Sequence, residues 1–281
     1  MSLPVFLVNG RESRQLDVAD RGFHYGDGVF ETIAFRQGRP QLWHRHLQRL
    51  QQACQRLSLT AVDEAQWLAD IEALQPPEDA VIKLIVSRGP SGRGYAWQKG
   101  DTVSRVTAVY PWPDYASENS RGIQTRICQT PVSMNPALAG IKHLNRLDNV
   151  LARNEWRDSD IVEGFMLDMN QHIIEGTMSN VFCVLDRHIY TPALDHAGVA
   201  GIMRGLIMEL CREMGLELSV IDISRENFLQ MDSVFICNSL IGIWPVSRVL
   251  HDTETTHFSQ AEWLVELQAR LTRKLHEDAT K

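Results

Sequence analysis

Residues 138–147, Leu-Ala-Gly-Ile-Lys-His-Leu-Asn-Arg-Leu, place a lysine among apolar residues at the start of a predicted amphipathic helix. Lysine is scarce in this chain, because only five of the 28 basic residues are lysines. A partly buried amine shifts toward its neutral, nucleophilic form, which Schiff-base chemistry with a carbonyl requires. The spacing alone favours the commoner arrangement, in which the stem of Lys142 packs and its ammonium reaches water. Lys83, inside the apolar run 81–86, is the competing candidate for the reactive amine.

Length and composition indicate an ordinary folded protein. The 281 residues correspond to about two domains, and 44% hydrophobic with 22% charged residues is far from a disordered or coiled-coil composition. The net charge of -7, without any cluster of basic residues, argues against nucleic acid as a partner. The five cysteines are odd in number and far apart, which argues against a disulfide framework and favours a reducing cytoplasm. No signal peptide and no apolar run of about 18 residues is found, so we expect a soluble, cytoplasmic protein with no membrane partner.

Short apolar runs alternate with amphipathic stretches, which predicts a mixed α/β (α+β) fold. Strands are predicted at 5–9, 29–35, 81–86, 103–110, 123–129 and 233–237, with a hairpin around Met169 and Asn170. Helices are predicted at 46–57, 63–74, 143–156 and 203–214, and a last helix is predicted to begin at Ser259, which has capping-box spacing to Glu262. The segment 113–121 is rich in turn formers and breaks both periodicities. We therefore expect a small N-terminal α/β domain at 1–112, a linker at 113–121 and a larger C-terminal domain at 122–281.

Several common catalytic motifs are absent. The sequence has no G-x-G-x-x-G before a helix, no P-loop, no H-E-x-x-H and no G-x-S-x-G. The ten histidines lack the spacing of metal ligands, so we expect no metal site. The dinucleotide-binding, zinc-enzyme and serine-hydrolase classes therefore lose their support.

Two further segments carry charge or binding potential. The stretch 198–205 is a glycine-bearing turn that leads into a helix, and free N–H groups at such a helix end bind phosphate. Glycines also open many helices simply as turns, so this signal is weak by itself. Glu175 stands at the end of an apolar strand, where an ordinary charge at a sheet edge is the commoner explanation.

Taken in order, a series of short segments resembles one enzyme family. The segments are 8–10 (VNG), 20–22 (DRG), 25–32 (YGDGVFET), 46–50 (HLQRL), Lys142, 175–176 (EG), 179–182 (SNVF), 201–204 (GIMR), 237–239 (CNS) and 245–246 (PV). They are similar to the fold-type IV pyridoxal-phosphate enzymes, which include branched-chain aminotransferases, D-amino acid aminotransferases and aminodeoxychorismate lyases. The resemblance covers nearly the whole chain. It implies a smaller N-terminal α/β domain, a larger barrel-like C-terminal α/β domain, a homodimer and pyridoxal 5'-phosphate as cofactor.

Within this family, the segments 87–95, 139–147 and 198–204 resemble the lyase branch. That branch converts the small molecule 4-amino-4-deoxychorismate to 4-aminobenzoate and pyruvate, a step of folate biosynthesis. The alternative is a D-amino acid or branched-chain aminotransferase of the same fold, and Glu31 suits both branches. The distant alternative is a non-catalytic binding protein that retains the fold. Lys142, Glu175 and Arg49 argue against it.

The resemblance implies a role for each matching residue. Lys142 would bind the cofactor covalently and then act as general base and acid, and Glu175 would pair with the pyridine nitrogen. The phosphate would be held by Arg49, the N–H groups of Ile202 and Met203, and Asn238 with Ser239. From the residues alone, Asn238 and Ser239 form an ordinary turn at a strand end.

The substrate would be bound and activated by residues of the N-terminal half. Thr32 would be the second catalytic residue, since its hydroxyl can orient or protonate the leaving enolpyruvyl oxygen. Arg93 and Tyr95, in a glycine-rich loop, together with Tyr25, would bind substrate carboxylates. The alternative for Arg93 is a solvated loop arginine.

Overall fold

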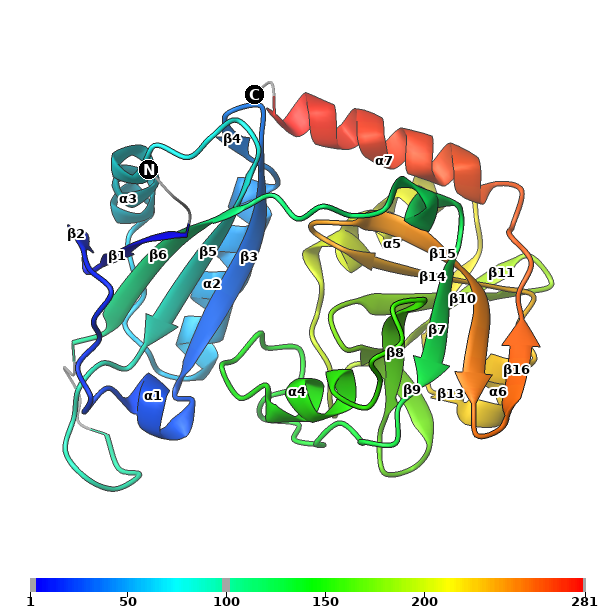
Figure 1. Cartoon of the computed structure of the whole chain (residues 1–281), viewed down its shortest axis with the longest axis horizontal. Coiled ribbons are helices and arrows are strands. Elements are labelled where there is room, and N and C mark those ends of the chain that lie inside the picture. The colour runs from blue at the N-terminus through cyan, green and yellow to red at the C-terminus, as the bar shows by residue number, and fades with distance from the viewer. Residues whose placement is uncertain (1–3, 98–101, 280–281) are drawn as a thin grey trace. The chain divides into compact units, whose positions relative to one another are not determined.

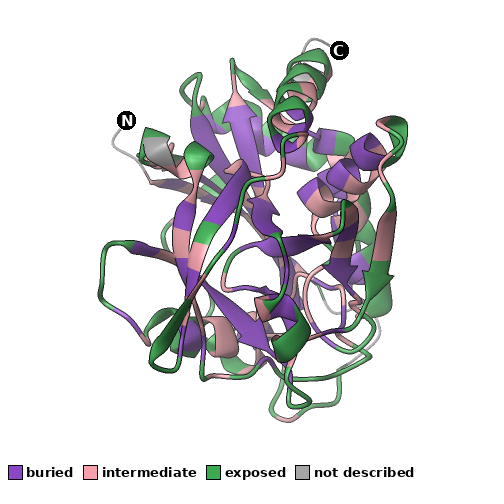
Figure 2. Cartoon of the chain, turned by 90° about the vertical axis from the view of Figure 1, so that its right-hand side faces the viewer, coloured by how far each residue is buried: buried purple, intermediate pink, exposed green. Residues whose placement is uncertain are grey.

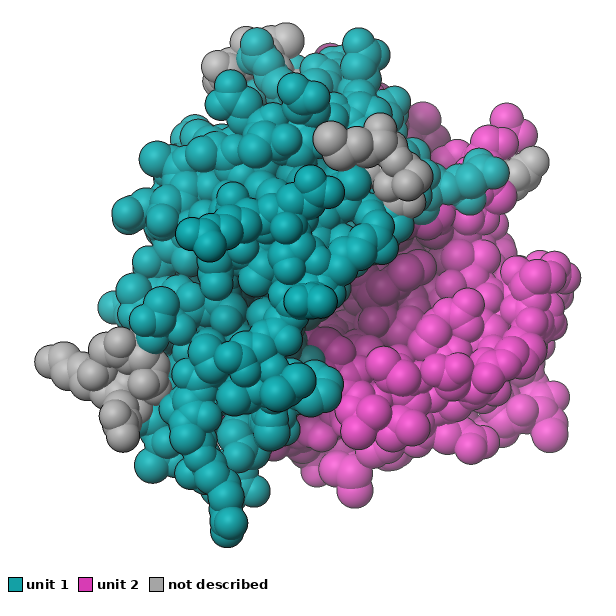
Figure 3. All heavy atoms as spheres, turned by 60° about the vertical axis from the view of Figure 1, so that its left-hand side comes forward, with its two compact units in different colours: residues 1–114, 142–145, 275–281 teal, residues 115–141, 146–274 magenta. Residues whose placement is uncertain are grey.

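The computed structural model describes residues 4–97 and 102–279, and the chain folds into two compact units (Figure 1). Unit 1 contains the chain up to Asp114, the short segment Lys142–Asn145 and the C-terminal residues from Leu275 (Figure 3). Unit 2 contains Tyr115–Ile141 and Arg146–Lys274. The division of the sequence into domains at 1–112 and 122–281, with a linker at 113–121, stays a prediction.

Unit 1 is built on a six-stranded sheet in which all neighbouring strands are antiparallel, in the order β2-β1-β6-β5-β3-β4. The strands are β1 (Val5–Val8), β2 (Arg11–Glu12), β3 (Gly28–Arg36), β4 (Arg39–Pro40), β5 (Ala80–Ser87) and β6 (Ser104–Pro111). The helices are α1 (Arg21–Tyr25), α2 (Trp43–Arg56) and α3 (Glu64–Leu74). Helix α2 packs against β3, and α3 packs against β1 and β6. Periodicity predicted α2 and α3 correctly to within three residues, because each buries an apolar face.

The helix predicted over 143–156 is wrong at its N-terminal end. Helix α4 extends only over Leu147–Arg153. The preceding residues instead pair with β3: Lys142 O accepts a hydrogen bond from Phe30 N at 2.9 Å, and Leu144 N donates to Gly28 O at 2.9 Å. Backbone groups that are committed to a strand cannot form i to i+4 helical bonds. The predicted reactive lysine therefore lies on an extended segment beside β3.

Unit 2 contains ten strands in a mixed sheet, in the order β12-β11-β10-β14-β15-β7-β8-β9-β13, with β16 paired to β15. The strands are β7 (Ile123–Ile127), β8 (Ile161–Leu167), β9 (His172–Gly176), β10 (Asn180–Leu185), β11 (His188–Pro192), β12 (Leu218–Ile221), β13 (Ile223–Ser224), β14 (Ser233–Asn238), β15 (Gly242–His251) and β16 (Glu254–His257). Besides α4, the helices are η1 (Ser117–Arg121), α5 (Ile202–Glu213), α6 (Arg225–Leu229) and α7 (Leu264–Ala279), of which the residues from Leu275 belong to unit 1. Strand β9 also contacts β10 and β11, so the sheet curls around a core that includes Phe165 and Phe228. Buried stretches, drawn in purple, lie mainly on the strands (Figure 2). The predicted mixed α and β fold class is confirmed.

The predicted hairpin around Met169 and Asn170 is present, and the helix predicted over 203–214 is α5, which extends over Ile202–Glu213. The prediction that the last helix begins at Ser259 is wrong, because α7 begins at Leu264. The N–H and the hydroxyl of Ser259 both donate to Asp232 O, at 2.9 and 2.7 Å. Its hydroxyl is therefore engaged by a distant loop and does not cap the helix. Among the helices that the structure describes, none has both the length and the hydropathy needed to cross a bilayer.

The packing of β3 against β5 and against residues 142–145 can be tested at Gly28. A Cβ atom at this position would lie 2.4 Å from Val86 O and 2.7 Å from a methyl group of Leu144. We expect Gly28→Ala to lower the free energy of unfolding by about 2 kcal/mol, because well-packed sites tolerate added volume poorly. Urea denaturation followed by circular dichroism measures this. The matched control is Gly92→Ala, since a Cβ at Gly92 meets nothing within 4 Å; equal stability of the two variants would contradict the packing described here.

Candidate functional site

The predicted reactive lysine lies over an aromatic ring of β3. The Lys142 ammonium is 4.4 Å from the centroid of the Phe30 ring. The Lys83 ammonium lies 5.1 Å from the same centroid. Thr32 pairs directly with Lys83 across β3 and β5. It also follows Phe30 by two residues on β3, so the side chains of Phe30, Thr32 and Lys83 lie on one face of the sheet. Unit 1 thus brings both predicted catalytic residues, Lys142 and Thr32, together with the competing lysine.

Arg49, the predicted phosphate ligand, is held by a buried carboxylate. Its Nε donates to Glu31 Oε1 at 2.7 Å, and its Nη2 donates to Glu31 Oε2 at 2.5 Å. His46 Nδ1 lies 2.7 Å from Glu31 Oε2. Glu31 is 1% exposed, and burial alone would raise its pKa, but Arg49 and His46 together lower the pKa to about 2. The carboxylate is therefore ionised and fixes the orientation of Arg49.

The role of Glu31 and His46 was missed by sequence analysis. A signal was present in the segment HLQRL, because His46 and Arg49 are three residues apart and so lie on one face of α2. What could not be read was their common partner, which stands on β3. On that strand Glu31 points toward α2, and its neighbours Phe30 and Thr32 point to the opposite face.

Glu175 is buried near the turn that precedes α5. Its side chain is 4% exposed, and its Oε2 accepts a hydrogen bond from Val199 N at 2.8 Å. Gly198 has a φ of +83°, and a Cβ there would lie 2.7 Å from Leu194 and 2.9 Å from Ile174, so glycine is needed at this position. The turn thus brings the predicted carboxylate close to the start of the helix.

Helix α5 begins at Ile202, with Gly201 as its N-cap residue. Asn180 packs against this turn, because its Nδ2 donates to Val199 O at 2.9 Å and its Oδ1 would lie 2.0 Å from a Cβ at Gly201. Met203 is 1% exposed, so only its backbone N–H could reach a ligand. The first N–H groups of a helix have no partner within the helix, which gives Ile202 and Met203 the donors that phosphate binding needs.

Asn238 ends β14 and organises the following turn. Its Oδ1 accepts hydrogen bonds from Leu240 N at 2.8 Å and Ile241 N at 3.0 Å, and its Nδ2 donates to Met178 O at 3.0 Å. This is the strand-end turn that the sequence left open as the alternative. Ser239 lies within the same turn. A phosphate role for Asn238 and Ser239 stays a prediction.

The three predicted substrate-binding residues gather in unit 1. The rings of Tyr25 and Tyr95 are 5.4 Å apart, and the Tyr25 hydroxyl accepts from Gly94 N at 3.4 Å. Arg21 donates to Gly94 O at 2.7 Å and to Tyr95 O at 3.0 Å. Arg93 lines a pocket of about 330 Å³ that Tyr25 and Arg21 also line. Tyr95 itself is 84% exposed, so it offers its ring to a ligand at little desolvation cost.

A second buried carboxylate, Glu163, was also missed. Its Oε1 accepts from the Thr177 hydroxyl at 2.5 Å, and its Oε2 accepts from the Ser179 hydroxyl at 2.7 Å. Burial raises the pKa of Glu163, and these hydroxyl donors oppose the shift. The side chain fixes the loop that follows Glu175. No sequence signal marked it, because Glu163 stands in a strand of otherwise apolar residues.

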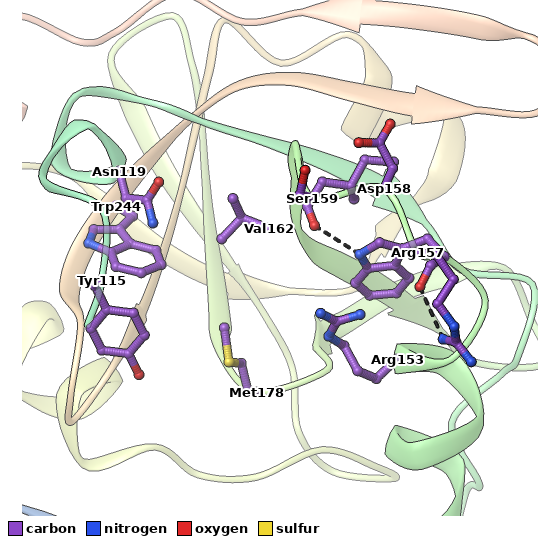
Figure 4. Close-up of a pocket in the computed structure, with 11 residues that line it drawn as sticks. Tyr115, Asn119, Arg153, Arg157, Asp158, Ser159, Val162, Met178 and Trp244 are labelled. Carbon is purple, nitrogen blue, oxygen red and sulfur yellow. Dashed lines mark hydrogen bonds between the residues drawn. The ribbon is translucent and has the colours of Figure 1, made fainter. Parts of the chain in front are cut away.

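Unit 2 also contains a pocket of about 460 Å³ that no prediction addressed (Figure 4). Tyr115 and Trp244 form one side, and Arg153 and Arg157 lie on the other, with Val162 between them. The ring of Tyr115 meets that of Trp244 edge-on at 5.1 Å.

Within the described residues, no group of three or more histidine, cysteine or acidic side chains is placed to hold a metal ion.

The Glu31 network predicts a specific acid sensitivity. Because the pKa of Glu31 is lowered from 4.5 to about 2, its contribution to folding is complete above about pH 4.5 and is lost as the pH falls toward 2. This contribution is about 3 kcal/mol by linkage. We expect urea denaturation over pH 2 to 5 to show a shallower pH dependence for Glu31→Gln than for the wild type. Glu262→Gln, at an exposed position, is the control; an unchanged slope in Glu31→Gln would refute the assignment.

Comparison with known proteins relates this geometry to one family. The family model for amino-transferase class IV matches residues 28–249. The aminodeoxychorismate lyase of Vibrio harveyi is 36% identical over 251 residues, which cover 87% of this chain and 91% of the relative. The crystal structure of 4-amino-4-deoxychorismate lyase from Pseudomonas aeruginosa has a TM-score of 0.86 at 40% identity and covers 97% of this chain and 98% of that one. The branched-chain amino acid aminotransferase of Escherichia coli has a TM-score of 0.80 at 25% identity, with 96% and 92% covered. The family match spans most of the chain and includes β3, Lys142, Glu175 and α5, and the protein therefore belongs to the class IV aminotransferase family.

Proposed function

We propose that this protein is a pyridoxal-phosphate-dependent lyase that converts 4-amino-4-deoxychorismate to 4-aminobenzoate and pyruvate, a step of folate biosynthesis. The observation that carries the proposal is the placement of the Lys142 amine and Thr32 at one face of β3, an amine and a hydroxyl suited to proton transfer. Similarity to two proteins named as this lyase, at 36% and 40% identity, supports it. An aminotransferase is the second candidate, since the Escherichia coli branched-chain enzyme matches nearly the whole chain.

The side chains present fit pyridoxal 5'-phosphate. Glu175 is a buried carboxylate that suits a protonated pyridine nitrogen, and Lys142 supplies the amine for the aldehyde. Arg49, the N–H groups of Ile202 and Met203, and the turn of Asn238 and Ser239 would hold the phosphate. When bound, the cofactor supplies an electron sink for the substrate carbon that bears the amino group.

The residues of the chain would then divide the remaining work. Lys142 Nζ would remove the proton from the ring carbon that bears the amino group, and it would later return a proton. Thr32 Oγ1 would donate a hydrogen bond or a proton to the enolpyruvyl oxygen as that group leaves. Arg93, Tyr95 and Tyr25 would bind the substrate carboxylates, for which a guanidinium and two hydroxyls are suitable donors.

Assembly and location are part of the same proposal. Family resemblance supports a homodimer. The cysteines Cys54, Cys128, Cys183, Cys211 and Cys237 are all free and buried, which supports a location in the reducing cytoplasm.

The deciding experiment supplies the cofactor-loaded protein with 4-amino-4-deoxychorismate and no 2-oxo acid. Equal, catalytic formation of 4-aminobenzoate and pyruvate is the expected result. No product, together with conversion of the cofactor to its amine form on addition of D-alanine or leucine, would establish the aminotransferase instead. A protein that gains no visible absorbance band on addition of pyridoxal phosphate would support the non-catalytic alternative.

Substitutions at the proposed catalytic residues should separate their roles. We expect Lys142→Ala to lower kcat at least about 1000-fold and Glu175→Gln to lower it about 100-fold, since the first removes the proton carrier and the second weakens the electron sink. Thr32→Val should lower kcat about tenfold or more with little change in KM. Steady-state assay of 4-aminobenzoate formation checks these values. Lys274→Ala, on the exposed side of α7, is the control; substantial activity in Lys142→Ala would reject the assignment.

A further inference from the structure

A buried arginine of unit 1 holds the loop that carries two of the proposed substrate ligands. Arg21 is 3% exposed, and its Nη1 and Nη2 donate to the carbonyl oxygens of Gly94 and Tyr95, at 2.7 and 3.0 Å. Its Nε donates to Asp27 Oδ2 at 2.9 Å. The planar guanidinium thus connects the residue before β3 with the loop backbone in one fixed geometry. Arg93 directly precedes Gly94, so these contacts also fix the backbone from which its side chain extends.

The two halves of this loop are attached in different ways. The first half is attached through the backbone, since Arg21 N donates to Gly89 O at 2.9 Å. The second half is attached through side chains, because Gly94 N donates to the Tyr25 hydroxyl and two carbonyl groups accept from the Arg21 guanidinium. The bond to Tyr25 is 3.4 Å long and therefore weak. Of these contacts, those of the guanidinium hold the second half most strongly.

Asp27 connects Arg21 with a second buried arginine, at the start of the loop. Arg88 donates from Nε and Nη2 to Asp27 Oδ2 and Oδ1, at 2.8 and 3.1 Å. It also donates to Leu57 O at 2.8 Å and to Ser58 O at 3.0 Å, just after α2. Burial alone would raise the pKa of Asp27, but Arg88 and Arg21 lower it, so the carboxylate is ionised. One carboxylate thus links both halves of the loop to the end of α2 and the start of β3.

Arg21 and Arg93 differ in what they can offer to a ligand, although both line the pocket of about 330 Å³. Arg93 is exposed, whereas Arg21 is buried and its guanidinium carbon lies 4.9 Å from the centroid of the Tyr25 ring. The Tyr25 ring in turn lies 5.4 Å from that of Tyr95. The Arg21 side chain therefore contacts the loop backbone and the paired rings and leaves little of its own surface free.

We propose that Arg21 is a positioning residue that fixes the loop segment 93–95 and thereby sets the affinity for an anionic substrate. This inference rests on the proposed function, in which Arg93, Tyr95 and Tyr25 bind substrate carboxylates. Ordering a loop during binding costs affinity, and a loop that is already held avoids this cost. Lysine cannot replace Arg21, because an ammonium group lacks the planar fork that reaches both carbonyl groups and Asp27 together.

The test measures how firmly the loop is held in the full-length, cofactor-loaded protein without substrate. Clostripain cleaves after arginine, and the carbonyl group of Gly94, which Arg21 holds, follows the bond after Arg93 directly. Cleavage of a native chain requires local opening, so its rate reports on the attachment of the loop. We expect cleavage after Arg93, followed by mass spectrometry, to be about tenfold faster in Arg21→Met and in Arg21→Lys. The matched control is Arg105→Met, which removes another largely buried arginine of unit 1, the partner of Asp70 on α3.

Steady-state kinetics give a second readout. In both Arg21 variants, KM for 4-amino-4-deoxychorismate should rise about tenfold and kcat should stay within about twofold, because the loop binds the substrate without carrying the proton. Arg105→Met should keep the wild-type KM and cleavage rate.

Three outcomes would overturn the proposal. A raised KM with unchanged cleavage would make Arg21 a substrate ligand, and faster cleavage with unchanged KM would separate the loop from substrate binding. Equal acceleration in Arg105→Met would mean that the stability of unit 1, and not Arg21, holds the loop. Because proteolysis needs no substrate, its result stands even where the lyase assay fails, so failure of this inference and failure of the proposed function are distinguishable.

Discussion

The pairing of residues 142–145 with β3 is the constraint on which the chemistry of unit 1 depends. Two backbone hydrogen bonds, from Phe30 N to Lys142 O and from Leu144 N to Gly28 O, fix an extended segment against the strand. Helix ends fray, so the amine of a lysine in the first turn of a helix would change its position whenever that turn opened. Here the amine extends from a backbone that is tied at two points to the sheet. The position of the amine relative to Thr32 is therefore set by strand register.

The buried glutamates Glu31, Glu163 and Glu175 are accommodated in different ways, and the difference determines what each can do. Glu31 faces a guanidinium and an imidazole and stays ionised. Glu163 has hydroxyl and N–H donors, and burial raises its pKa. Glu175 accepts a hydrogen bond from the Val199 N–H at the start of the turn before α5. A carboxylate paired with a full cation serves structure, because removal of either partner leaves a buried charge. In that turn Glu175 accepts a hydrogen bond from a neutral N–H group, and a buried carboxylate at this place suits the cationic ligand that we propose.

Local sequence patterns predicted the elements whose stability is local, and failed where a distant segment decides. The apolar stripe of α2 and the alternation along β3 are properties of consecutive residues, so both were found. The helical pattern after His143 and the capping spacing at Ser259 were equally clear. However, the backbone at 142–144 forms hydrogen bonds with β3, and Ser259 donates to Asp232 O. The roles of Glu31 and Glu163 were missed for the same reason, because the function of a carboxylate on a strand depends on the residues that pack against it. The proposed site residues came from resemblance, since the spacing around Lys142 favoured an ordinary lysine.

The commitment of Arg49 to Glu31 changes what this arginine can contribute to a phosphate. An arginine side chain carries about 2 kcal/mol of rotamer entropy, which a free side chain would lose on binding. The two hydrogen bonds that Arg49 donates to Glu31 have already removed most of that freedom. The same carboxylate offsets part of the guanidinium charge, so long-range attraction of an anion is weakened. Arg49 is therefore suited to hold a phosphate in one orientation more than to draw it in, and preorganisation of this kind lowers the cost of binding without a new contact.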